Sequence, residues 1–138
     1  MTFALPNAMP TSTPHQILIV EDETSIRDTL VEFFEMEGNQ VTAAAELTEA
    51  IDFMRRRRFD LIVTDLRLGP KREGGLQVIA LAGMLSPDAL VLVLTAFPDD
   101  ASRQASQRLG ALHFLEKPVD LGTLAMHASS IGVHTAFK

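Results

Sequence analysis

The chain has 138 residues, of which 46% are hydrophobic and 22% are charged, which is the composition of one folded globular domain of ordinary size. Twelve Lys and Arg stand against 18 Asp and Glu, giving a net charge of −6, so direct binding to the phosphate backbone of nucleic acid is not expected. The absence of cysteine excludes disulfides, thiolate zinc sites and cysteine nucleophiles.

The N-terminal residues have the composition of a flexible arm. Pro6, Pro10 and Pro14 lie among Thr, Ser and Asn over residues 1–16, a mixture that neither continues a helix nor buries much surface. We expect one domain over residues 17–131 and a C-terminal tail over 132–138. No apolar run is long enough to span a membrane and no signal segment is present, so we expect a cytoplasmic protein without a membrane partner.

Five segments are predicted to be strands. Three are short, apolar and without alternation, as in parallel strands that helices cover on both faces; two weaker segments complete the set. In chain order the predicted strands are Ile17–Val20, Gln40–Ala44, Leu61–Thr64, Leu90–Leu94 and His113–Leu115.

The segments between these strands have the spacing of amphipathic helices. The first helix is predicted to begin at Thr24 as its cap and to end before Gly38, while Gly122 weakens the last one. The other predicted helices are about 47–54, 76–84, 101–109 and 121–130. Strand and helix therefore alternate five times, which predicts an α/β three-layer sandwich with a parallel sheet.

Ligands of such sheets bind beyond the carboxyl ends of the strands, and here those ends carry polar residues. Glu21 and Asp22 follow the first predicted strand, and Asp65 follows the third. Two unit charges 4 Å apart repel by about 4 kcal/mol at an effective dielectric near 20, so a cation must balance these acids. A hard divalent ion such as Mg²⁺ suits oxygen ligands, and Lys117 after the fifth strand supplies an ammonium.

Four short motifs together resemble the response-regulator receiver domain of two-component signalling. They are the acidic pair in LIVEDE, the aspartate in LIVTDLRLG, the hydroxyl and small residue in LVLTA, and the lysine and proline in FLEKP. The resemblance covers about residues 17–130. It implies a flavodoxin-like, doubly wound (βα)5 fold with strand order 2-1-3-4-5.

The resemblance also implies a role for each strand-end residue. Asp65 would accept a phosphoryl group from a sensor histidine kinase or a phosphotransfer protein, which makes the chain an assisting phosphoacceptor and not an enzyme. Mg²⁺ or Mn²⁺ would be held by Glu21, Asp22, Asp65 and the backbone carbonyl of Arg67. The phosphoryl oxygens would be bound by Thr95, Ala96 and Lys117, and the bond before Pro118 would be cis.

Switching is a further expectation from the resemblance. Thr95 would move toward the phosphoryl group and Phe114 would rotate inward, changing the face of the fourth helix, fifth strand and fifth helix for a downstream protein or a second copy of the chain. Arg67 and Phe97 flank the phosphoryl position in the family and tune its hydrolysis, and here they predict a long-lived phosphorylated state.

Other interpretations exist for these residues. Glu21 and Asp22 taken alone are capping or loop acids, Asp65 alone is a turn residue, and Phe114 is a plain core ring. A pseudo-receiver that binds proteins without being phosphorylated is the main rival. An aspartyl phosphatase is disfavoured by Arg67, which replaces its second aspartate, and a flavin carrier by the acidic segment after the first strand. The arginines at 55–58 are interpreted as a solvated helix end.

Overall fold

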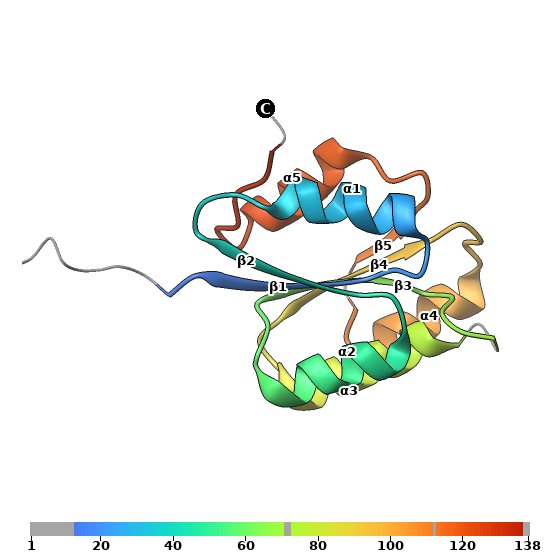
Figure 1. Cartoon of the computed structure of the whole chain (residues 1–138). Coiled ribbons are helices and arrows are strands. Elements are labelled where there is room, and N and C mark those ends of the chain that lie inside the picture. The colour runs from blue at the N-terminus through green and yellow to red at the C-terminus, as the bar shows by residue number, and fades with distance from the viewer. Residues whose placement is uncertain (1–12, 71–72, 112, 137–138) are drawn as a thin grey trace, which may run out of the picture.

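A computed structural model describes residues 13–70, 73–111 and 113–136. Of the predicted arm, residues 1–12 lie outside the described residues. The described chain forms a five-stranded parallel sheet in the order β2-β1-β3-β4-β5 (Figure 1), which confirms the predicted fold. The strands are β1 (His15–Val20), β2 (Asn39–Ala44), β3 (Leu61–Asp65), β4 (Leu90–Thr95) and β5 (His113–Glu116).

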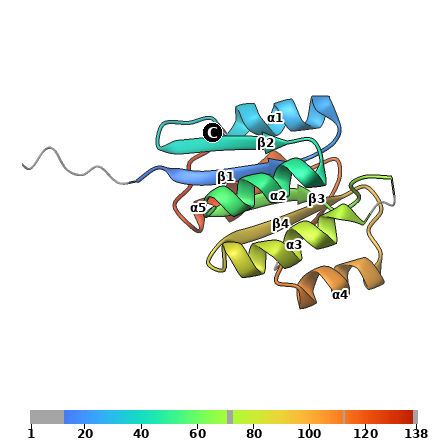
Figure 2. The ribbon, with the colours of Figure 1, turned by 60° about the horizontal axis from the view of Figure 1, so that its bottom comes forward.

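Helices cover both faces of the sheet. They are α1 (Thr24–Phe34), α2 (Leu47–Arg56), α3 (Gly74–Leu85), α4 (Asp100–Arg108) and α5 (Leu121–Ser129). α1 and α5 lie on one face, and α2, α3 and α4 lie on the other (Figures 1 and 2). None of the helices in the described part of the chain combines the length and the apolar character needed to cross a bilayer.

The alternating side chains of the central strands supply a core on each face. On the face of α2 and α3, Leu18, Ile62 and Val93 are buried; Ile19 and Leu94 are buried on the face of α1 and α5. Strands covered on both faces need apolar residues at every position, which explains why the sequence of these strands has no alternation.

Both ends of the predicted domain extend further than expected. β1 begins at His15, so His15 and Gln16 belong to the sheet and not to the arm. The backbone N–H of Gln16 donates to Asp60 Oδ2 at 2.7 Å, and that of His15 donates to the Gly38 carbonyl at 2.9 Å. At the other end Val133, predicted to be in the tail, is 2% exposed in the core of the α1 and α5 face.

The start of α1 also differs from the prediction. Thr24 is the first helical residue, and the cap position is Glu23, whose side chain makes no capping hydrogen bond. Asp99 and Asp120 do cap their helices, since Asp99 accepts from the Ser102 N–H and Asp120 from the Gly122 N–H. Capping depends on the backbone conformation before the helix, which the type of residue alone does not fix.

Candidate functional site

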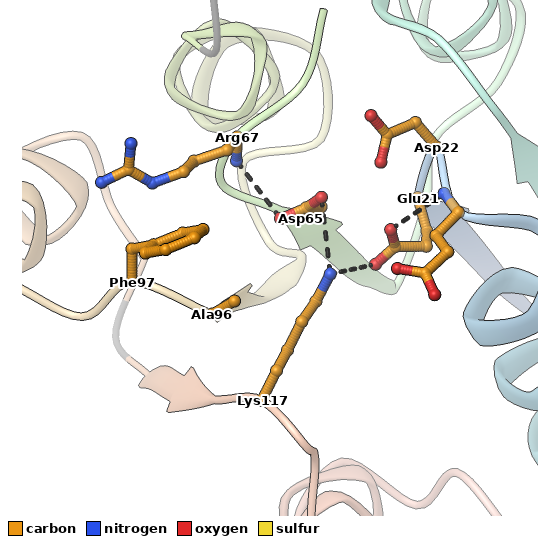
Figure 3. A pocket seen from close by; sticks show the side chains of 8 residues that line it. Glu21, Asp22, Asp65, Arg67, Ala96, Phe97 and Lys117 are labelled. Atoms are coloured by element: carbon orange, nitrogen blue, oxygen red, sulfur yellow. Dashed lines mark hydrogen bonds and ion pairs between the residues drawn. The ribbon is translucent and has the colours of Figure 1, made fainter.

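The strand ends that the sequence singled out meet in one hollow of about 390 Å³ (Figure 3). Glu21 follows β1, Asp65 ends β3, Thr95 ends β4 and Lys117 follows β5. Parallel strands all present their carboxyl ends at the same edge of the sheet, which is why residues far apart in the sequence lie together. The lining residues are Glu21, Asp22, Glu23, Asp65, Arg67, Ala96, Phe97 and Lys117.

Asp65 is nearly buried, with 6% of its surface exposed. Its Oδ1 accepts a hydrogen bond from the Arg67 N–H at 3.2 Å, and its Oδ2 lies 3.5 Å from Lys117 Nζ. Behind it α3 begins at close range, because a Cβ on Gly75 would lie 2.4 Å from the Asp65 carbonyl oxygen. The Asp65 carboxylate is therefore held by a main-chain N–H and by the ammonium of Lys117.

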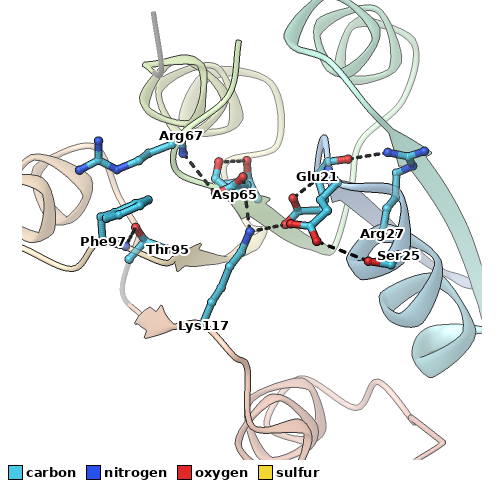
Figure 4. A network of polar contacts seen from close by, with 10 residues as sticks. Glu21, Ser25, Arg27, Asp65, Arg67, Thr95, Phe97 and Lys117 are labelled. Atoms are coloured by element: carbon cyan, nitrogen blue, oxygen red, sulfur yellow. Dashed lines mark hydrogen bonds and ion pairs between the residues drawn. The ribbon is translucent and has the colours of Figure 1, made fainter. Parts of the chain in front are cut away.

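Glu21 makes the closer contact with the lysine. It is 1% exposed, its Oε1 lies 2.8 Å from Lys117 Nζ, and its Oε2 accepts from the Glu23 N–H at 3.1 Å. The Arg27 side chain in turn donates to the Glu21 carbonyl at 2.9 Å (Figure 4). Lys117 thus bridges the first and third strands, with its ammonium between two carboxylates.

Burial sets the protonation behaviour of this cluster. Desolvation raises the pKa of both Glu21 and Asp65, while the contacts with Lys117 act in the opposite direction. Burial also opposes the charge on Lys117, but hydrogen bonding to Glu21 and the charge of Asp65 outweigh it and raise the pKa of the lysine. The lysine therefore stays charged, whereas burial makes the charged forms of the two acids less favourable.

Three carboxylates converge beside this lysine. Glu21, Asp22 and Asp65 each place one oxygen within 4.8 Å of the others, and Asp22 is the exposed member. One ammonium leaves such a cluster with a net negative charge. All-oxygen ligands, with one open to solvent, fit a hard divalent cation that retains some of its water.

Ala96 lines the hollow at the end of β4, and Thr95 is the residue before it. Thr95 is fully buried, and its Oγ1 accepts a hydrogen bond from the Phe97 N–H at 3.0 Å (Figure 4). The Thr95 carbonyl accepts from the Lys117 N–H at 2.7 Å, which joins the two strand ends. The Lys117–Pro118 peptide bond is cis.

Arg67 and Phe97 lie at the opposite side of the hollow from Glu21 (Figure 3). The Arg67 guanidinium carbon is 5.0 Å from the centre of the Phe97 ring, and Arg67 Nη2 is 3.6 Å from Asp99 Oδ2. The side chain therefore points away from Asp65 although its backbone N–H binds that residue. Nothing in the sequence spacing of Arg67 and Asp99 predicts this pairing.

Phe114 does not line the hollow. It lies in β5, half-buried, and packs against the core on the face of α2 and α3. The Arg103 guanidinium carbon of α4 lies 4.8 Å from the centre of its ring. The residue therefore touches the site only through its strand, which leads to Lys117 three residues later.

This chain is similar to known proteins in sequence and in fold. The family model described as response regulator receiver domain matches residues 17–129. Sporulation initiation phosphotransferase F of Bacillus subtilis (strain 168) is 33% identical over 77% of this chain and 84% of its own length. The alginate biosynthesis transcriptional regulatory protein AlgB of Pseudomonas aeruginosa is 32% identical over 83% of this chain, which spans only 25% of that relative.

Two solved structures have the same fold. A response regulator of Burkholderia pseudomallei, described with a phosphorylated aspartic acid, calcium ion and citrate, has a TM-score of 0.73 and 31% identity over 80% of this chain and 64% of its own. A CheY-like receiver domain protein of Methanospirillum hungatei has a TM-score of 0.77 and 26% identity over 85% of this chain and 92% of its own. Fold, site and relatives agree: this chain belongs to the response regulator receiver domain family.

Proposed function

We propose that the protein is a phosphorylation-activated switch in which Asp65 accepts the phosphoryl group. The observation that carries the proposal is the place of Asp65, between the Lys117 ammonium and two further acids at the functional edge of the sheet. A carboxylate oxygen of Asp65 forms a bond to phosphorus while the bond from phosphorus to the donor's histidine nitrogen breaks. Such transfer depends mainly on positioning and on neutralising the phosphoryl oxygens.

The acid cluster is where we propose the metal. Glu21, Asp22, Asp65 and the backbone carbonyl of Arg67 would hold Mg²⁺ or Mn²⁺, with Glu21 acting through a water because Lys117 already contacts its Oε1 at 2.8 Å. The ion would supply positive charge beside the transferring oxygens. Lys117 supplies the second positive charge, from the side of β5.

The remaining phosphoryl contacts come from β4. Thr95 accepts through Oγ1 from the Phe97 N–H, so its hydroxyl hydrogen is available to donate to a phosphoryl oxygen. Ala96, exposed at the hollow, offers a backbone N–H with no large side chain in the way. The protein thereby assists its own phosphorylation and dephosphorylation without acting on a separate substrate.

The phosphoryl donor is proposed to be a sensor histidine kinase or a phosphotransfer protein. An apolar hollow of about 300 Å³ lies next to the site, where Ile26 and Leu30 of α1 face Pro118 and Leu121. A donor helix with an apolar stripe fits there and brings its histidine close to Lys117. Because such kinases draw on ATP, we place the protein in the cytoplasm.

Signal output is proposed to run through the face made by α4, β5 and α5. Thr95 would be drawn to the phosphoryl group and Phe114 would turn inward, releasing its contact with Arg103 and changing this face for a downstream protein or a second copy. Hydrogen exchange tests this: beryllofluoride, a phosphoryl analogue, should change exchange in α4 and β5 of the wild type. An equal change in Phe114→Ala would remove Phe114 from the mechanism.

Arg67 and Phe97 are proposed to prolong the phosphorylated state. Both residues line the hollow beside Asp65, where Phe97 would obstruct an attacking water and Arg67 would shield the acyl phosphate. Phosphorylated protein freed of donor should lose its phosphoryl group faster after Phe97→Ala or Arg67→Ala. If neither substitution changes that rate, the pair has no such role.

Intact mass spectrometry tests the proposed function. With acetyl phosphate and Mg²⁺ the wild type should gain the mass of one phosphoryl group, and removal of Mg²⁺ with a chelator should prevent the gain. Asp65→Asn should gain nothing, while Asp88→Asn, a change at an exposed loop acid, should behave as the wild type. A wild type that is never labelled would favour the rival function, an unphosphorylated protein-binding module.

A further inference from the structure

Asp99 connects the phosphoryl site to the start of α4. It is the N-cap of that helix, where Oδ1 accepts from the Ser102 N–H at 2.8 Å and Oδ2 accepts from the Ser102 hydroxyl at 3.0 Å. The same Oδ2 lies 3.6 Å from Arg67 Nη2. One carboxylate therefore caps a helix and holds the side chain of the residue two positions after Asp65.

Arg67 is held at both of its ends. Its backbone N–H donates to Asp65 Oδ1 at 3.2 Å, while its guanidinium rests over the Phe97 ring and against Asp99, pointing away from Asp65 (Figure 3). Its Nε is buried and has no hydrogen-bond partner among the described residues. The guanidinium thus keeps an unused donor, and Asp99, its ionic partner among the described residues, is already engaged with Ser102.

The ion pair that holds the guanidinium is weak. The side chains of Arg67 and Asp99 are 33% and 47% exposed, and ion pairs open to solvent contribute little to stability. A phosphoryl group on Asp65 brings a charge of about −1.5 to −2 and three acceptor oxygens. It therefore competes with Asp99 for the same guanidinium.

We propose that Asp99 is a positioning residue: it holds the Arg67 guanidinium away from Asp65 until phosphorylation draws that guanidinium to the phosphoryl group. This inference rests on the proposed function and adds to it a second partner for Arg67. When the Arg67–Asp99 ion pair breaks, the N-cap of α4 loses one of its contacts. Phosphorylation would therefore also weaken the link between the loop after β3 and α4.

The substitution Asp99→Asn separates the two tasks of the residue. Asparagine caps helices as well as aspartate does, so α4 keeps its start, but the charge that holds Arg67 is lost. The matched control is Asp100→Asn, which changes the neighbouring acid in the first turn of α4. Thermal unfolding of both variants checks that the fold is retained.

Binding of beryllofluoride with Mg²⁺, followed by fluorine NMR, is the test. Asp99→Asn should bind about 3-fold tighter than the wild type, which is the effect of an exposed ion pair; Asp100→Asn should match the wild type. In an Arg67→Ala background Asp99→Asn should have no effect. Where Arg67 is present, high salt should reduce the difference in affinity between Asp99→Asn and the wild type, because salt screens an exposed charge pair.

Three outcomes overturn the proposal. Unchanged affinity in Asp99→Asn means that Asp99 does not restrain Arg67. If Asp99→Asn changes the affinity equally in the wild-type and the Arg67→Ala background, Asp99 acts through the helix cap alone. If the wild type binds no beryllofluoride, the proposed function fails and this inference fails with it. If the wild type binds and either of the first two outcomes is found, only this inference fails and the proposed function stands.

Discussion

Asp65 ends a buried strand, where its charge is costly. Desolvation raises its pKa, and although Lys117 and the Arg67 N–H counteract this, Asp22 adds to it. The charged carboxylate is thus less favourable here than in water, and perturbed groups of this kind cluster at functional sites.

Asp65→Asn should therefore stabilise the protein. Without divalent metal at neutral pH, its free energy of unfolding in urea should exceed that of the wild type by about 1 kcal/mol. Because the pKa of Asp65 is raised in the folded chain, this difference is full above the folded pKa and shrinks as the pH falls toward the ordinary value of 3.8. A less stable Asn variant would contradict this view of the charge.

Two glycines of α3 offer a matched pair of substitutions. A Cβ at Gly75 would lie 2.3 Å from the Leu66 carbonyl oxygen, whereas one at Gly83 meets only the Leu109 carbonyl oxygen at 3.8 Å. Gly75→Ala should cost about 2–3 kcal/mol because backbone must move, and Gly83→Ala should gain about 0.5–1 kcal/mol. Urea unfolding measures both; equal effects would show that α3 does not need a glycine behind Asp65.

Among the elements, α4 is held by few apolar contacts. Its sequence, DASRQASQR, contains no large apolar residue, and Ser106 is its one buried residue. The Ser106 hydroxyl is buried and has no hydrogen-bond partner among the residues that the structure describes. By contrast, α1 buries Leu30, Phe33 and Phe34, so the two helices differ in what anchors them to the sheet.

Amide hydrogen exchange should accordingly be faster in α4 than in α1, because local opening follows buried apolar contact. Ser106→Ala removes the unsatisfied hydroxyl and should slow exchange in α4, with a gain of about 1 kcal/mol. Exchange in α1 serves as the internal control. Equal protection of the two helices in the wild type would show that α4 is anchored in some other way.

α5 meets β5 through a pair of histidines. The rings of His113 and His127 are in contact, with centres 3.9 Å apart and planes tilted by 33°. Burial, and then the charge of His113, lower the pKa of His127 below its ordinary 6.5. The fold thus disfavours the charged form of His127.

Stability should therefore fall as the pH drops below about 6.5, since the unfolded chain then binds the proton more readily than the folded one. Measured by urea unfolding between about pH 7 and pH 5, the decline should be less steep in His127→Gln than in the wild type. His134→Gln, a change at an exposed residue, should keep the wild-type slope. Parallel curves for the wild type and His127→Gln would exclude the histidine pair as the cause.

At the scale of the whole molecule, alternation of strands and helices predicted the α/β fold, because strands such as Leu61–Asp65 begin with an unbroken apolar run and are buried at every position. Strand order came from the family resemblance, as local patterns do not encode which strands are neighbours. The extension of β1 to His15 was missed because its pairing depends on distant partners, among them Asp60.

The residues of the site could be predicted from the sequence, but the contacts between them could be predicted only in part. Glu21, Asp22, Asp65 and Lys117 are brought together by topology, which the positions at the strand ends predicted. Sequence does not determine that Lys117 lies nearer Glu21 than Asp65, or that Arg67 turns to Asp99. Those choices depend on side-chain directions that only the packed structure fixes.

The most direct test locates the phosphoryl group on the chain. After incubation with acetyl phosphate and Mg²⁺, reduction with borohydride converts an aspartyl phosphate to homoserine, and peptide mass spectrometry then identifies the residue. Homoserine is expected at position 65 alone, and none is expected without Mg²⁺. Homoserine at another aspartate, or phosphorylated protein without homoserine at position 65, would contradict this expectation.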